Sequence, residues 1–107
     1  MEPSEFARLA DGCLEQVATW LEAFDPDEVD FSTPDGVVTI EFPDGAKYVL
    51  NRQSATNQMW FAAGARAWHY DLDQASSKWL CDKDQHELFA CIAESISAKI
   101  GRSVDAL

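Results

Sequence analysis

The chain has 107 residues, with 19 acidic and 8 basic side chains and a formal net charge of −11. The whole imbalance lies in residues 1–44, which hold 12 carboxylates against one cation, Arg8, whereas residues 45–107 hold 7 charges of each sign. Nucleic acids and anionic membrane surfaces are bound by concentrated basic patches, so both partner classes are excluded. An acidic region instead attracts metal cations or a basic protein surface.

The length predicts a single domain over residues 1–107, and 47% hydrophobic residues suffice for a core and argue against disorder. No apolar run approaches the roughly 18 residues of a membrane span, and the first residues have no signal-peptide pattern, so we expect a cytoplasmic protein. Cys13, Cys81 and Cys91 are expected to be reduced thiols. A structural zinc site is not expected, because closely spaced pairs of ligands are absent.

Residues 4–24 have apolar side chains at helical spacing and predict an amphipathic helix. Ser4 is the expected N-cap, and Pro26 ends the helical pattern. Asp11, Glu15 and Glu22 fall together on another face of this helix, since about 100° separates successive residues.

The middle of the chain is rich in strand-forming residues separated by short polar turns, which predicts antiparallel neighbours. A second helix is expected to close the chain, with an apolar stripe from Leu88 to Ile100, Asp84 and Glu87 as a capping pair at its start and Gly101 as its stop. The fold class is therefore α+β: a two-layer α-β sandwich with two terminal helices on one face of a five- to six-stranded antiparallel sheet. The expected strands are residues 29–32, 37–42, 47–52, 59–63, 67–72 and 78–82.

The chain carries no enzyme signature, and we expect it not to be an enzyme. No serine lies in a Gly-x-Ser-x-Gly context, and neither a dinucleotide-binding loop nor a phosphate-binding loop is present. The two histidines, His69 and His86, are not placed by spacing next to a nucleophile. His69 could ligate a metal or could be a hydrogen-bonded surface residue.

The acidic residues are densest at the end of the first helix and in the segment that follows it. Their oxygen ligands suit hard cations such as Ca²⁺, Mg²⁺, Mn²⁺ and iron, and a bound cation would relieve their mutual repulsion. The alternative is a solvated acidic face that only aids solubility. The candidate metal ligands, which we call the ridge, are Asp11, Glu15, Glu22, Asp25, Asp27, Glu28 and Asp30.

A second candidate surface follows from alternation along the strands. If Leu50, Met59 and Phe61 face the helices, then Asn51, Gln53, Gln58 and Trp60 lie on the open face. Amides around an exposed tryptophan are typical of a protein-binding site, whereas a buried Trp60 with amides at the strand ends is the alternative. The other tryptophans, Trp20, Trp68 and Trp79, are expected in the core or at its edge.

Several segments together resemble the bacterial frataxin (CyaY) family: Ser4–Asp11, the acidic helix end, Asn51-Arg52-Gln53, Gln58-x-Trp60-x-Ala62 and His69-Tyr70-Asp71. The resemblance implies the same α-β sandwich, weak binding of Fe²⁺ and Fe³⁺ on the ridge, and a role in iron–sulfur cluster assembly. The implied partners are the cysteine desulfurase and the iron–sulfur scaffold protein. The frataxin would regulate the desulfurase in response to iron or act as an iron donor. The implied partner-binding residues are Asn51, Arg52, Gln53, Gln58 and Trp60. A monomer is expected, with oligomers in the presence of iron.

Two other functions stay open: a metal-independent acidic interaction module, and a ferroxidase or iron-storage protein. The chain also departs from the family where a glycine pair usually precedes the aromatic-histidine element, since Arg66 and Ala67 stand there after Gly64. Losing that conformational freedom is expected to alter the turn between the two strands.

Overall fold

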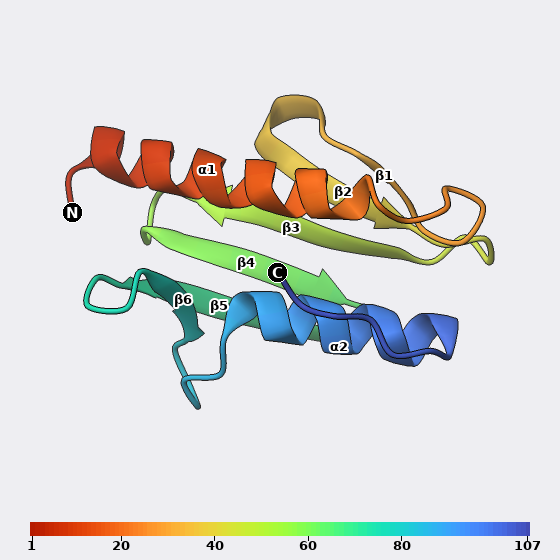
Figure 1. Ribbon diagram of the computed structural model, residues 1–107. Helices are drawn as coiled ribbons and strands as arrows, with labels where there is room; N and C mark the ends of the chain where they lie inside the picture. Colours follow the sequence, from red (N-terminus) through yellow and green to blue (C-terminus); the bar gives the residue numbers. More distant parts are fainter.

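The computed structural model describes all 107 residues as one α-β sandwich. Six strands form one antiparallel sheet in the order β1 to β6, and the two helices lie side by side on one of its faces (Figure 1). The predicted fold class is confirmed. The elements are α1 (Pro3–Leu21), β1 (Asp30–Ser32), a short 3₁₀ turn (Pro34–Gly36), β2 (Val37–Glu41), β3 (Lys47–Gln53), β4 (Gln58–Ala63), β5 (Arg66–Asp73), β6 (Lys78–Cys81) and α2 (Leu88–Ile100).

Helix α1 differs from its prediction at both ends. Pro3 occupies the first turn and Glu2 is the N-cap, without a side-chain hydrogen bond, so the expected cap at Ser4 is wrong. Proline suits this position because the first N–H groups of a helix have no intrahelical partner. The helix ends at Leu21, and Phe24 N–H donates to the Leu21 carbonyl in a tighter turn. The buried stripe of α1 is Phe6, Ala10, Cys13, Leu14, Val17 and Leu21.

The sheet has one covered face and one open face, as alternation along the strands predicts. Leu50 pairs with Phe61, and Met59 pairs with Tyr70, and all four side chains are fully buried against the helices. Their neighbours along each strand point to the open face. Trp79 is buried, and Trp20 and Trp68 are half-buried against the core, which confirms their predicted places.

Helix α2 is capped by Glu87, whose carboxylate accepts hydrogen bonds from the N–H groups of Phe89 (2.7 Å) and Ala90 (3.0 Å). The expected capping pair is therefore wrong: Asp84 lies outside the helix and accepts a hydrogen bond from the His86 N–H instead. Gly101 ends α2 in the left-handed conformation, with φ 77°, as predicted.

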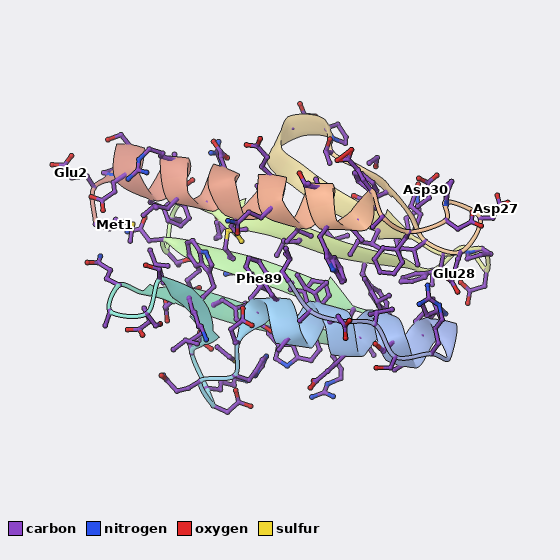
Figure 2. The ribbon with its side chains drawn as sticks, viewed as in Figure 1. Met1, Glu2, Asp27, Glu28, Asp30 and Phe89 are labelled. Carbon is purple, nitrogen blue, oxygen red and sulfur yellow. The ribbon has the colours of Figure 1, made fainter.

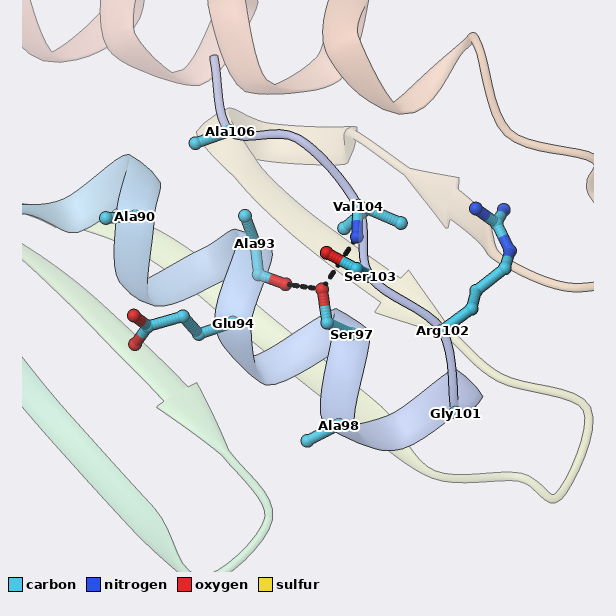
Figure 3. A pocket seen from close by; sticks show the side chains of 10 residues that line it. All are labelled: Ala90, Ala93, Glu94, Ser97, Ala98, Gly101, Arg102, Ser103, Val104 and Ala106. Atoms are coloured by element: carbon cyan, nitrogen blue, oxygen red, sulfur yellow. Dashed lines mark hydrogen bonds between the residues drawn. The ribbon is translucent and has the colours of Figure 1, made fainter.

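After α2 the chain turns back toward α1 and ends between the two helices (Figure 1). Ser97 Oγ donates to the Ala93 carbonyl (2.6 Å) and accepts from the Val104 N–H (3.0 Å), as Figure 3 shows. The Trp20 indole N–H donates to the Asp105 carbonyl (3.2 Å). A depression of about 590 Å³ lies between this tail and α2.

All three cysteines are free and buried. In the β4–β5 turn only Gly64 has a positive φ (63°), and Arg66 already belongs to β5. Neither helix has the length and apolar character that crossing a membrane would require.

Candidate metal-binding ridge and partner face

The helical part of the ridge lies on the exposed side of α1. Asp11, Glu15 and Glu22 are all exposed, and Glu22 is the C-cap of the helix. The last turn contains no basic residue, so nothing compensates the negative end of the helix dipole there. A cation bound near Glu22 would interact favourably with both the dipole and the carboxylate.

The segment after α1 folds into a tight loop that presents the remaining ridge acids. Asp25 organises it: its carboxylate accepts from the Asp27 N–H (2.9 Å), and its carbonyl accepts from the N–H groups of Glu28 and Val29 (both 2.9 Å). Val29 is buried and anchors the loop to the core. Figure 2 shows Asp27, Glu28 and Asp30 gathered at the same end of the molecule.

Two ridge acids are already paired with cations of the chain. Arg52 contacts Asp11 at 2.7 Å, and Arg102 forms a two-pronged pair with Glu28 at 2.6 and 3.2 Å. The hydrogen bond from Arg102 holds the pKa of Glu28 below its usual value. The acids of the ridge that form no salt bridge are Glu15, Glu22, Asp25, Asp27 and Asp30.

The ridge is spread out rather than gathered into a chelating cage. Only one group of three His, Cys, Asp or Glu side chains has its ligand atoms within 4.8 Å of one another, and it lies elsewhere, at Cys81, Asp84 and His86. Exposed carboxylates that do not converge suit loosely held, exchangeable hard cations better than a tight resident metal.

Trp60 lies half-buried on the open face of the sheet, within a polar network. Its indole N–H donates to Gln58 Oε1 (3.0 Å), and Gln58 Nε2 donates to Asp71 (3.2 Å) and Asp82 (3.3 Å). One face of the indole stacks on His69, with ring centroids 4.3 Å apart and planes 17° apart. The tryptophan is thus held rigidly, and it is not part of the core.

The neighbours of Trp60 extend this surface, which we call the partner face, as the alternation predicts. Asn51 pairs with Trp60 and Gln53 pairs with Gln58 across β3 and β4. Arg52 does not belong there: it pairs with buried Met59, so its side chain lies on the helix-covered side and reaches Asp11 of α1. Arg52 therefore lies next to the ridge and not on the open face, while its part in partner binding stays a prediction.

The histidines behave differently from each other. His69 stacks on Trp60 with Nδ1 3.8 Å from Asp82, so it is a surface residue held by stacking. His86 joins Cys81 and Asp84 in a cluster that sequence reasoning missed. The signal was three different ligand types within six residues, but only the turn between β6 and α2 makes them neighbours.

Comparison with known proteins decides the family. A sequence profile of the frataxin-like domain matches residues 1–102. The chain belongs to the frataxin family. A frataxin of the CyaY family from Psychromonas ingrahamii has 28% sequence identity and a TM-score of 0.87, over 98% of this chain and 97% of that one. The predicted resemblance to bacterial frataxin is confirmed.

Two structures of yeast frataxin are also similar to this chain. A trimeric frataxin from Saccharomyces cerevisiae, in complex with ferrous iron, has 26% identity and a TM-score of 0.76, over 88% of this chain and 87% of that one. A trimeric form with its full-length N-terminus has 25% identity and a TM-score of 0.65, over 86% of this chain and 75% of that one.

Proposed function

We propose that this frataxin binds Fe²⁺ and Fe³⁺ weakly on the ridge and regulates the cysteine desulfurase of cytoplasmic iron–sulfur cluster assembly. It acts as an iron-responsive regulator or as an iron donor, and it is not an enzyme. The observation that carries the proposal is the ridge itself, with five carboxylates that form no salt bridge, four of them at or beyond the negative end of α1. The ferrous complex of the yeast relative supports iron as the cation.

The partner is expected to meet the ridge and the partner face together. Complementary charge between the acidic ridge and a basic groove accelerates encounter, while a rigid tryptophan serves as an anchor. Trp60 is held for this role by its contacts with Gln58 and His69. Arg52 acts indirectly, by holding Asp11 beside β3. The iron–sulfur scaffold protein is a second expected partner.

Iron and partner binding are expected to be coupled, because each iron ion reduces the negative charge that attracts the desulfurase. By linkage, the factor by which iron changes desulfurase affinity equals the factor by which the desulfurase changes iron affinity. Without iron we expect a monomer, and with iron we expect oligomers, as the trimeric ferrous form of the yeast relative suggests.

Isothermal titration calorimetry of the desulfurase with the intact protein, with and without anaerobic Fe²⁺, tests this proposal. Iron should change the affinity, and the triple variant Glu22→Gln, Asp25→Asn, Asp27→Asn should remove that change. The matched control neutralises three acids outside the ridge, Glu2, Glu5 and Asp35, and should behave as wild type.

Identical affinities with and without iron contradict the coupling. If the triple variant then binds the desulfurase more weakly while no Fe²⁺ binding is measurable, the protein is a metal-independent interaction module. Fe²⁺-dependent oxygen consumption faster than the buffer control would instead show ferroxidase activity.

A further inference from the structure

The loop between β6 and α2 folds back on itself and brings distant ligand types together. The Cys81 N–H donates to the His86 carbonyl (2.8 Å), and the Gln85 N–H donates to the Cys81 carbonyl (3.0 Å). Gln85 reverses the chain with a positive φ of 67°. Asp84, at the turn, is thereby directed back toward both Cys81 and His86.

Three potential ligand atoms converge at this turn: the Cys81 Sγ, an Asp84 carboxylate oxygen and a His86 ring nitrogen lie within 4.8 Å of one another. Their exposure increases from the interior to the surface: Cys81 is 1% exposed, and the side chains of His86 and Asp84 are 30% and 69% exposed. A depression of about 460 Å³ that Cys81 and Asp84 line gives access from solvent.

The His86 ring is oriented as a metal-ligating imidazole would be. Its Nε2 lies 2.6 Å from the hydroxyl of buried Tyr70, and its Nδ1 lies 2.6 Å from Asp84 Oδ1. The rings of Tyr70 and Trp68 contact it edge-on, at 5.2 and 5.9 Å between centroids. Because a carboxylate oxygen only accepts, the metal-free ring donates its Nδ1–H to Asp84, and its Nε2 accepts from the Tyr70 hydroxyl. A metal that takes Nδ1 displaces that proton, and an Nε2–H then donates to the Tyr70 oxygen, which is the fixed second partner characteristic of ligating histidines.

We propose that Cys81, Asp84 and His86 form a second metal site, separate from the ridge, for Zn²⁺ or a similar divalent cation that prefers sulfur and nitrogen ligands. One thiolate, one imidazole and one carboxylate are typical zinc ligands, and three of them leave a fourth position for water. Zinc–ligand bonds of about 2.0–2.3 Å hold neighbouring ligand atoms roughly 3.5 Å apart. Asp84 Oδ1 and His86 Nδ1 lie closer than this, at 2.6 Å, and all three ligand atoms lie within 4.8 Å of one another, so metal binding requires shifts of about 1 Å, for which the exposed Asp84 side chain has room.

The two sites differ in place and in chemistry. The loop between β6 and α2 lies at the far side of the molecule from the loop that joins α1 to β1 (Figure 1). The ridge offers oxygen alone, which suits iron and other hard cations, whereas Cys81 adds a thiolate to its site. The site at Cys81 can therefore fill with zinc while the ridge stays available to iron.

Anaerobic titration of the reduced, metal-free protein with Co²⁺, a spectroscopic stand-in for Zn²⁺, tests this inference. We expect a thiolate-to-cobalt charge-transfer band that one equivalent of Zn²⁺ removes. His86→Gln should weaken Co²⁺ binding roughly 100-fold or more, and Tyr70→Phe, which removes only the acceptor of the second N–H, about 10-fold. Matched controls are Cys13→Ala, another buried thiol, and His69→Gln, the other histidine, and both should retain the band.

No charge-transfer band in wild type overturns the proposal, as does a band of unchanged strength in His86→Gln. Since that variant could disturb the turn, nitrogen NMR of the His86 ring in the wild-type protein provides a second measurement. Zn²⁺ should shift the Nδ1 resonance to a metal-bound position and leave Nε2 protonated. An unchanged His86 ring at saturating Zn²⁺ also overturns the proposal.

Discussion

Replacing Ser97 with alanine tests how the C-terminal tail is held against α2. The Ser97 hydroxyl accepts a hydrogen bond from the half-buried Val104 N–H at 3.0 Å and donates one to the Ala93 carbonyl at 2.6 Å (Figure 3). In Ser97→Ala the Val104 N–H loses its partner, and the tail loses its link to the helix.

The cost follows from these contacts. A buried donor left without a partner costs about 1–3 kcal/mol, and we take about 1.5 kcal/mol because Val104 is only partly buried. Alanine regains roughly 0.5 kcal/mol through its higher helix propensity. The net loss of unfolding free energy is about 1 kcal/mol, which lowers the Tm by roughly 4–6 °C in a domain of this size.

Urea denaturation and thermal unfolding of four proteins measure this loss of unfolding free energy. The four are wild type and Ser97→Ala, each prepared once with the full tail and once shortened to end at residue 102. Ser103→Ala, in the exposed part of the tail, is the control and should be neutral. In the shortened chains Ser97→Ala should be neutral or slightly stabilising, because no Val104 N–H remains. An equal loss in full-length and shortened chains would refute the reasoning, as would no loss in the full-length protein.

Four further predictions concern the C-terminal tail, the β6–α2 loop and the open face. Arg102→Gln frees the Glu28 carboxylate, so the Fe²⁺ affinity measured by calorimetry should rise. The increase should be less than about fivefold, because exposed ion pairs contribute little. A fall in affinity would contradict the assignment of iron to the ridge. Because the pKa of Glu28 is lowered in the folded protein, its pairing with Arg102 stabilises the protein above pH 4.5, and this stabilisation is lost as the pH falls through the native pKa. The Tm of Arg102→Gln should therefore depend less on pH on the acid side than the Tm of the wild type. Gln85→Gly relieves a left-handed residue and should stabilise the protein by about 0.5–1 kcal/mol in thermal unfolding, whereas Gln74→Gly, at a turn position with negative φ, should not stabilise it. Trp60→Ala should weaken desulfurase binding by about 2 kcal/mol or more in calorimetry, and unchanged affinity would exclude this face from the interface.

The layers of the fold follow from periodicity alone. Leu50, Met59 and Phe61 alternate along their strands, and the structure buries all three beneath the helices. Helix starts were less predictable, because several side chains compete for the same backbone groups. Glu87 caps α2 itself, since the Asp84 carboxylate is already occupied by His86.

The candidate site was predictable where the chain order matches the spatial order. Asp27, Glu28 and Asp30 are neighbours in sequence and remain neighbours in space (Figure 2). The face on which Arg52 lies was not predicted, because the resemblance groups a run of three residues, whereas alternation places the middle one on the other face. The cluster of Cys81 and His86 depends on a single turn with an unusual φ, for which the sequence has no glycine to signal it.

Paramagnetic broadening of amide resonances by anaerobic Fe²⁺ tests the central claim most directly. The account predicts that substoichiometric Fe²⁺ selectively broadens residues 22–30 and the α1 positions of Asp11 and Glu15, and that the Glu22→Gln, Asp25→Asn, Asp27→Asn variant loses this broadening. Broadening centred on the open face or on the β6–α2 loop, or persisting unchanged in that variant, would contradict the assignment of iron to the ridge.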